Sequence, residues 1–186
     1  MKIIETSIKD IKIIQPQVFD DERGFFLESY RENWFRDNVA NVSFVQDNHS
    51  KSSYGILRGL HYQIQQPQGK LVRVISGEAY DVAVDMRQSS STFGQWEGIL
   101  LSAENKRQLW VPPGFAHGFY VTSKSAEFVY KCTDYYAPEY EKSLLWNDTK
   151  LNIQWPIPAS ESPQLSPQLS AKDKAGLSFK DSEYFS

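Results

Sequence analysis

The stretch Ala79-Tyr80-Asp81-Val82-Ala83-Val84-Asp85-Met86 alternates strictly between two kinds of side chain. The tyrosine and the large apolar residues share one face, while the two alanines and the two aspartates share the other. Successive side chains of a strand point to opposite faces, so this period of two predicts a β-strand with two distinct surfaces. It is the best strand signal in the chain, and it indicates a fold built from sheets.

Similar short runs rich in β-branched and aromatic residues lie on both sides of this stretch. Turns that contain Gly, Pro, Ser or Asn separate them, as expected between strands. Many short strands divided by such turns are typical of an all-β sandwich or barrel. The further predicted strands cover residues 11–14, 25–30, 42–46, 56–63, 70–75, 96–101, 107–111, 118–121 and 126–132.

Helical signals are weak and lie near the two ends of the chain. The Ser and Glu of residues 29–32 predict a capping box for a short helix through Asn38, and residues 170–173 predict another helix start. Several prolines mark an irregular connector between them. No internal repeat is present, and the length fits a single domain over residues 1–186, in which residues 156–186 form a C-terminal connector and short helix.

Composition excludes several classes of protein. The net charge is −3, and no basic block stands out, which argues against a nucleic-acid partner. An acid at Glu5 stands too early for a signal peptide, and no apolar run approaches the length of a membrane span. We therefore expect a cytoplasmic protein without a membrane partner. Cys132 is the single cysteine, which we expect to be a small buried strand residue.

The segment Arg58-Gly59-Leu60-His61-Tyr62-Gln63 places two charged or titratable side chains in a predicted apolar strand. Burying such groups is costly, so Arg58 and His61 together suggest a functional interior. Strict alternation would put them on opposite faces, but a glycine in a strand often marks a bulge that redirects a side chain. The residues alone leave a structural and a catalytic histidine equally open. Lys70 begins the next strand and can face the same cavity, although an exposed strand lysine is the commoner case.

The segment Val111-Pro112-Pro113-Gly114-Phe115-Ala116-His117-Gly118-Phe119 resembles the second motif of the cupin superfamily of β-barrels. In metal-binding cupins this motif supplies one histidine ligand, and the first motif begins with two histidines separated by one residue. Here Gln63 stands where the second of those histidines would be, and the chain holds only three histidines in all. The sequence therefore predicts a cupin jelly roll, with short peripheral helices near both ends, and no metal site.

Two further stretches offer ligand-binding groups without deciding their use. In residues 23–28, an Arg and a Glu flank two aromatic residues, which suits an anionic, hydroxylated ligand but also an edge strand with solvated ends. Tyr130 shares a strand face with Phe128 and Cys132, and core packing would explain its position equally well.

Taken together and in this order, several segments closely resemble the family of dTDP-4-dehydrorhamnose 3,5-epimerases, the RmlC type. A single motif of this kind is weak, but the set spans the chain from about residue 3 to about residue 180. The chain is thereby identified as a member of this family. The segments are residues 23–28, 46–50, 58–63, 94–96, 101–105, 113–119, 145–148 and 169–173.

The resemblance implies a homodimer that acts on dTDP-4-dehydro-6-deoxy-D-glucose without a metal or organic cofactor. It implies that His61 is the base, oriented by Asp173, that Tyr130 is the acid on the other side of the sugar, and that Lys70 lies near the C4 oxygen. It also implies that Tyr136 stacks on the thymine. The other nucleotide-sugar contacts that it implies come from Arg23, Phe26, Glu28, Gln46, Asn48, Arg58, His117, Glu141 and Lys172. Asp173 has a simpler interpretation too, as the acidic residue of the capping box begun at Ser170.

The chemistry suits these residue types. Removing a proton beside the C4 ketone leaves an enolate, and a histidine, with a reference pKa of about 6.5, can act as the base at neutral pH. A lysine can stabilise the oxyanion, and a tyrosine can return a proton. Alternatives on the same barrel are a single-site 3- or 5-epimerase and a 3,4-ketoisomerase. A non-catalytic sugar-binding cupin and a metal-dependent cupin oxygenase are further alternatives; the pairing of His61 with Tyr130 favours the double epimerase.

Overall fold

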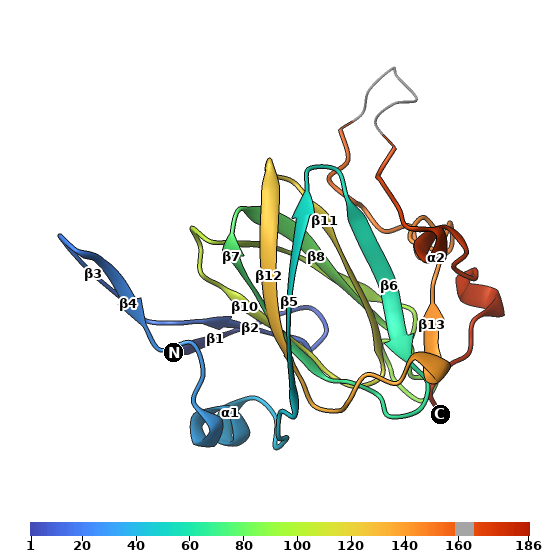
Figure 1. Ribbon diagram of the computed structural model, residues 1–186. Helices are drawn as coiled ribbons and strands as arrows, with labels where there is room; N and C mark the ends of the chain where they lie inside the picture. Colours follow the sequence, from blue (N-terminus) through green and yellow to red (C-terminus); the bar gives the residue numbers. More distant parts are fainter. Residues whose placement is uncertain (159–165) are drawn as a thin grey trace.

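The computed structural model describes residues 1–158 and 166–186, which form two large antiparallel sheets and a separate two-stranded hairpin (Figure 1). The larger sheet has, in spatial order, strands β1 (Lys2–Glu5), β2 (Lys12–Gln15), β10 (Gln108–Val111), β7 (Lys70–Ser76), β12 (Ser125–Cys132) and β5 (Gln46–Ser53). The smaller sheet has β13 (Glu141–Ser143), β6 (Leu57–Gln63), β11 (Phe115–Val121), β8 (Glu78–Asp85) and β9 (Trp96–Ser102). The predicted all-β architecture is confirmed.

The strand that opened the sequence analysis lies inside the smaller sheet as β8, and its two faces meet different surroundings. Ala79 and Ala83 join a core cluster between the two sheets, together with Val72 and Phe128 of the larger sheet. The residues on the other face belong to a second cluster, which covers the outer face of the smaller sheet. The alternation in the sequence therefore distinguishes the residues that face the interior of the barrel from those that face its outer side.

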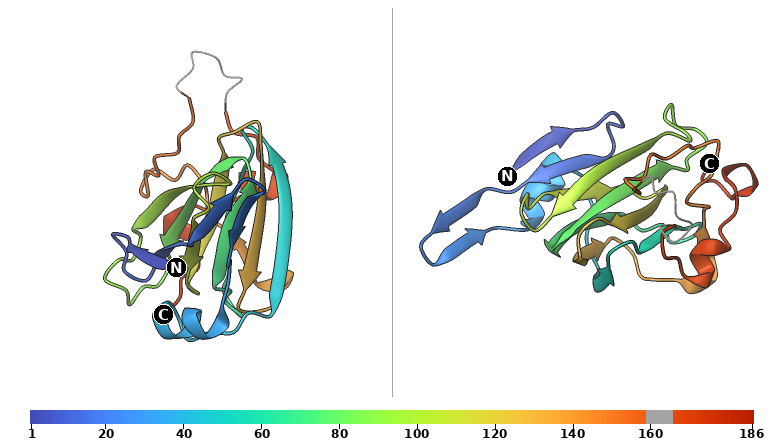
Figure 2. Two further views of the ribbon diagram at one scale, coloured as in Figure 1. Left: turned by 90° about the vertical axis from the view of Figure 1, so that its left-hand side faces the viewer. Right: turned by 90° about the horizontal axis from the view of Figure 1, so that it is seen from above.

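Three strand predictions were wrong in extent. The strand expected over residues 118–121 begins at Phe115, as β11. Residues 42–46 were expected to form a strand, whereas β5 begins at Gln46 and continues through the polar run to Ser53. This strand is at the edge of its sheet and mostly alternates between half-buried and exposed residues, so it needs few apolar side chains. The strand expected over residues 25–30 ends at Leu27, where β4 (Gly24–Leu27) pairs with β3 (Val18–Asp21) in a separate hairpin. Figure 2 shows this hairpin projecting beyond the barrel.

The two predicted helices are present, but only one has the predicted cap. Helix α1 (Glu32–Asn38) starts after Arg31 without a side-chain cap, so the capping box expected from Ser29 is wrong. Phe35 instead anchors this helix in a third apolar cluster with Trp110. Helix α2 (Ala171–Lys174) has the predicted capping box between Ser170 and Asp173. None of the helices in the described part of the chain is long and apolar enough to span a membrane.

The C-terminal segment brings α2 against the smaller sheet. A 3-10 turn, η1 (Pro138–Tyr140), leads into β13, and a second, η3 (Phe179–Asp181), buries Phe179 in the outer cluster. Isolated bridges join Ile56 to Gln168 and Leu144 to Leu177, so the segment follows the sheet on both sides of α2. The predicted irregular connector from Pro156 is confirmed as far as residue 158, while Pro163 lies outside the described residues.

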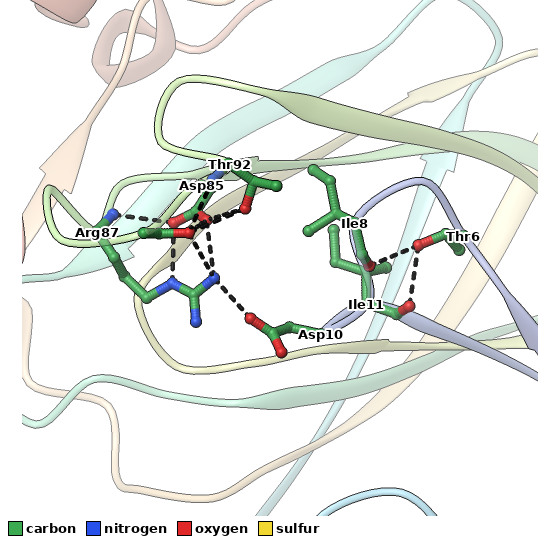
Figure 3. A network of polar contacts seen from close by, with 8 residues as sticks. Thr6, Ile8, Asp10, Ile11, Asp85, Arg87 and Thr92 are labelled. Carbon is green, nitrogen blue, oxygen red and sulfur yellow. Dashed lines mark hydrogen bonds and ion pairs between the residues drawn. The ribbon is translucent and has the colours of Figure 1, made fainter.

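A network of polar contacts ties the N-terminal loop to the end of β8 (Figure 3). The carboxylate of Asp85 accepts hydrogen bonds from Arg87, from Ser90 and from Thr92, and Arg87 also donates to Asp10 at 2.8 Å. These donors outweigh the opposing effect of burial and hold the pKa of Asp85 at about 2. The guanidinium of Arg87 lies 4.6 Å from the centre of the Phe115 ring. The network fixes the start of β11, the strand that carries His117.

Candidate active site

A bulge in β6 turns Arg58 and His61 toward the same cavity. His117 of β11 pairs with His61, and Phe119 of β11 pairs with Arg58. These pairs are two residues apart on β11 but three residues apart on β6, so β6 contains one extra residue. Gly59 lies in this bulge with φ of 121°, and a Cβ there would approach the Cα of Gly118 to 2.5 Å. Only glycine fits this backbone without strain. The predicted redirection of a side chain at Gly59 is confirmed.

His61 and Asp173 form a close pair between β6 and α2. The Nε2 of His61 lies 2.7 Å from Oδ1 of Asp173, at an angle that departs from a well-aligned hydrogen bond. The same oxygen accepts from the amide of Gly59 at 3.1 Å, and Oδ2 accepts from the Ser170 hydroxyl at 2.6 Å. Asp173 is 2% exposed; burial opposes its ionisation, but His61, Ser170 and Gly59 outweigh burial and hold its pKa well below the usual range.

The capping box of Asp173 is confirmed, and the geometry leaves room for its predicted role beside His61. One carboxylate oxygen closes the capping box of α2, and the other faces the imidazole of His61. The cap fixes the carboxylate, so the carboxylate can in turn fix the tautomer and the orientation of the ring. A four-residue helix is thus the element that aligns the predicted base.

Tyr130 and Lys70 face His61 from the other wall of the barrel. They lie on the neighbouring strands β12 and β7, with Cys132 paired to Lys70 and Tyr130 paired to Val72. Neither side chain makes a hydrogen bond to another residue in the described ranges. Burial raises the pKa of the Tyr130 phenol, so the phenol keeps its proton at neutral pH. Burial lowers the pKa of Lys70, and nearby Cys132, Glu141 and Asp81 oppose that effect.

These side chains line a cavity of about 560 Å³ between the two sheets. Arg58 is held there by a bond from its Nε to the Ser52 hydroxyl at 2.9 Å, and His117 contacts the buried Asp81 at 2.8 Å. Seven of the predicted site residues meet in this cavity: Arg58, His61, Lys70, His117, Tyr130, Lys172 and Asp173.

A second cavity of about 300 Å³ adjoins the first and shares His61, Lys70 and Tyr130 with it. Four more predicted residues line this second cavity: Gln46, Asn48, Tyr136 and Glu141. The three residues expected to move protons or stabilise charge therefore lie where the two compartments meet. An elongated ligand that occupied both would place its central part beside them.

The rim of the second cavity is organised around Glu141. Its carboxylate accepts a hydrogen bond from Tyr136 Oη at 2.7 Å, forms an ion pair with Lys172 and lies 3.9 Å from Nδ1 of His61. Burial opposes ionisation of Glu141, but Lys172 and Tyr136 outweigh burial and hold its pKa below the usual range. The bond to Glu141 also raises the pKa of Tyr136 to about 12. Tyr136 is 53% exposed, so its ring is open to a ligand.

Three predicted ligand contacts do not reach either cavity within the single chain. Arg23, Phe26 and Glu28 lie on or beside the β3–β4 hairpin, which extends away from the barrel (Figure 1). The guanidinium of Arg23 pairs with Asp21, and Phe26 is 70% exposed. Their predicted role stays a prediction.

Other residues in or behind the cavity walls were not singled out by the sequence analysis. Asp81 lies behind the wall, in contact with His117; it is fully buried, and its Oδ2 has no hydrogen-bond partner in the described ranges. Phe119 stacks on Phe128 with ring centres 4.0 Å apart and forms an apolar wall. In the sequence, two aspartates share a strand face with the alanines of residues 79–86. An acid on such an apolar face indicates a buried polar group, and this pattern could have identified Asp81. In residues 1–158 and 166–186, no three His, Cys, Asp or Glu side chains converge as a metal site requires.

Comparison with known proteins matches residues 5–181 to the family model of dTDP-4-dehydrorhamnose 3,5-epimerase. A protein of that name from Pseudomonas aeruginosa is 55% identical over 186 residues, which is 100% of this chain and 99% of the relative. Another from Neisseria gonorrhoeae is 56% identical over 183 residues and 98% of this chain. The chain spans about half of that relative's length, 54%.

Among solved structures, an epimerase from Legionella pneumophila in complex with dTDP-4-keto-L-rhamnose superimposes with a TM-score of 0.92. It is 52% identical in sequence, and the match covers 98% of this chain and 94% of that one. The cupin-type barrel predicted from the sequence is thus confirmed by a close structural relative.

Proposed function

The chain belongs to the dTDP-4-dehydrorhamnose 3,5-epimerase family, and from that premise we propose how its own residues carry out the reaction. The chain acts as an isomerase of dTDP-L-rhamnose biosynthesis. It inverts C3 and C5 of dTDP-4-dehydro-6-deoxy-D-glucose and gives dTDP-4-dehydro-L-rhamnose.

One observation supports the proposed mechanism above all others: the candidate base and the candidate acid face each other from different sheets. His61 lies on β6 of the smaller sheet, and Tyr130 lies on β12 of the larger one. Inversion at carbon requires a proton to leave one face and another to arrive at the opposite face. A sugar ring held between the two walls would present one face to the imidazole and the other to the phenol.

In each half of the reaction, His61 takes the proton from the carbon beside the C4 ketone, and the electron pair moves to the ketone oxygen as an enolate. Asp173 stabilises the imidazolium that forms. The ammonium of Lys70 faces the enolate oxygen in the buried lumen, where a fixed charge counts most. Tyr130 then donates its phenolic proton to the opposite face of the carbon, and the ketone is restored. Solvent re-protonates Tyr130 and takes the proton from His61.

The remaining polar residues suit the dTDP part of the substrate. Arg58 and Lys172 provide positive charge beside the reacting centre, and an arginine fork binds phosphate oxygens in pairs. Tyr136, Gln46 and Asn48 line the adjoining cavity, where the exposed ring of Tyr136 is suited to stacking on the thymine. We assign His117 and Glu141 to further contacts with the nucleotide sugar.

We further propose that the chain works as a homodimer in which the β3–β4 hairpin serves the partner's site. Three aromatic residues of the hairpin, Phe19, Phe25 and Phe26, are more than half exposed, which favours burial against a second copy. Such an arrangement would give Arg23, Phe26 and Glu28 a cavity to contact.

Mixed dimers test this arrangement. One chain carries His61→Ala, and the other carries Arg23→Ala with Phe26→Ala; each homodimer should have low activity. If hairpins act on the partner, the mixed dimer contains one intact site and regains up to about half of the activity of a normal dimer. Absence of any recovery would show that the hairpin does not complete the partner's site.

We also propose that the protein acts in the cytoplasm as a single domain. Both sheets share one interior cluster, and the C-terminal segment packs on the outer face of the smaller sheet. Cys132 is a buried free thiol, a state that a reducing compartment preserves.

The direct test of function is NMR in deuterated water with dTDP-4-dehydro-6-deoxy-D-glucose as substrate. We expect deuterium at both C3 and C5 and a product with the L-rhamno configuration. Exchange at only one carbon would indicate a single-site epimerase, and movement of the keto group to C3 would indicate a ketoisomerase.

A further inference from the structure

The loop that presents Tyr136 is held by glutamine side chains at four successive residues. Gln68 Nε2 donates to the carbonyl of residue 134 at 2.8 Å, and Gln63 Nε2 donates to that of residue 135 at 3.2 Å. Gln46 Oε1 accepts from the amide of Tyr136 at 2.9 Å, and Gln63 Oε1 accepts from the amide of residue 137 at 3.0 Å. We call Gln46, Gln63 and Gln68 the glutamine clamp.

Gln63 is the central member of the clamp. Its amide contacts the backbone on both sides of Tyr136, and its Nε2 also donates to the carbonyl of Gln66 at 2.8 Å. The side chain is 4% exposed, and its bond with the amide of residue 137 is buried. A buried amide that lost these partners would be costly, and this fixes the loop strongly. Gln63 ends β6, two residues after His61, so the clamp starts from the strand that carries the base.

The ring of Tyr136 has few contacts of its own. It is largely exposed, and the hydroxyl bond to Glu141 restrains only its tip. A flat ring can stack on a base only if the backbone beneath it holds one position, because otherwise binding must first order the loop. The glutamine clamp removes that cost before the ligand arrives.

We infer that Gln63 is a positioning residue for nucleotide recognition: it couples the strand of His61 to the loop of Tyr136 and sets the affinity for dTDP. The inference rests on the proposed function, since it takes dTDP as the ligand of the second cavity. It also gives a role to the position where metal-binding cupins carry a histidine. In this chain the side chain at that position binds the backbone of the nucleotide loop.

The test is a double-mutant cycle with Gln63→Met and Tyr136→Ala, read out as dTDP affinity by calorimetry and as kcat and KM by the epimerase assay. Methionine keeps the length of glutamine and removes its hydrogen bonds. We expect Gln63→Met to weaken dTDP binding and raise KM by roughly tenfold, the effect of losing the two bonds to residues 135 and 137, with kcat within about twofold. The double variant should bind about as weakly as Tyr136→Ala alone, because both changes remove the same stacking contact.

The matched control is Gln15→Met, since Gln15 also bridges a loop, with bonds to Asn105 and Arg107, but away from the cavities. It should leave dTDP affinity unchanged. Normal dTDP affinity in Gln63→Met, or additive effects in the double variant, would overturn the inference. If Gln63→Met does not fold, Gln68→Met decides, with two- to threefold weaker binding expected and unchanged binding counting against the clamp.

The failure of the proposed function looks different. If the unmodified chain binds dTDP but does not epimerise the sugar, the function is wrong while the clamp is still tested by affinity. If the unmodified chain does not bind dTDP at all, the proposed function and the inference resting on it both fail.

Discussion

Two clusters of ionisable side chains in this barrel differ in how completely their polar atoms are paired. At the end of β8, the carboxylate of Asp85 accepts from Arg87, Ser90 and Thr92, and Arg87 also binds Asp10 (Figure 3). In the lumen, Lys70 and Tyr130 make no hydrogen bond within the described residues. In the first group the polar atoms bind one another, whereas in the second the ammonium and the phenol remain free to bind a ligand.

The difference separates a structural network from a reactive one. Buried polar groups are normally paired, because an unpaired one forfeits its hydration without compensation. Lys70 and Tyr130 are only half-buried and face the open cavity, where a bound substrate would supply partners for their polar atoms. Substitutions in the lumen should act on catalysis and leave stability nearly unchanged, while substitutions in the Asp85 network should do the opposite.

The largest expected effect is the loss of activity in His61→Ala. Without the base, neither C3 nor C5 can lose its proton, and kcat should fall by about 10³-fold or more. Deuterium incorporation at both carbons in deuterated water should disappear. Affinity for dTDP, measured by calorimetry, should stay near that of the unmodified protein. Retained exchange at either carbon would remove His61 from the base role at that carbon.

Tyr130→Phe should have a smaller and more selective effect. The base can still remove a proton, so exchange at C5 should persist, but the acid that completes inversion is missing. We expect the rate of inverted product to fall by about 10²-fold, a typical contribution of a general acid. Simultaneous NMR of exchange and product separates the two steps. Normal product formation would indicate that water or another side chain supplies the proton.

The sequence predicted the fold and most of the candidate site, and the failures have physical reasons. Periodicity found β8, and the glycine at position 59 indicated the bulge that aims Arg58 and His61. The edge strand β5 escaped detection because it is polar and shows no apolar periodicity. The glutamine clamp was also missed, since Gln46, Gln63 and Gln68 act on a backbone that is distant in sequence. Hydrogen bonds between a side chain and a distant backbone depend on how the strands pair. Here they depend on the register of β6, β5 and β13, which the sequence does not reveal.

In the Asp85 network, the substitution Asp85→Asn should lower stability and preserve activity. The substitution removes a fully buried carboxylate that accepts from Arg87, Ser90 and Thr92, and the loss of these charge-assisted hydrogen bonds costs about 3 kcal/mol. For a chain of this size the melting temperature should fall by roughly 6–12 °C. At a temperature where the variant is still folded, kcat/KM should stay within about twofold of normal. A large loss of kcat/KM in folded protein would mean that the network acts on the lumen through β11.

The smallest expected effect is the dependence of stability on acid pH, which the same network controls. The pKa of Asp85 is about 2 in the folded chain and about 3.9 when unfolded, so the folded state favours the ionised form. A group with a lowered pKa stabilises the fold above its unfolded pKa and loses that contribution as the pH falls through its folded pKa. The free energy of unfolding should therefore drop by roughly 2 kcal/mol on Asp85's account between pH 4 and pH 2.

Urea unfolding at constant ionic strength, at several pH values between 5 and 2, measures this slope. Asp173 also has a lowered pKa and contributes in the same direction, so the unmodified chain should lose stability steeply in this range. In Asp85→Asn the slope should become shallower, because one of the carboxylates with a lowered pKa no longer takes up a proton on unfolding. An identical slope in the two proteins would mean that Asp85 titrates alike in both states, and the paired network would then not be the source of the difference from the lumen.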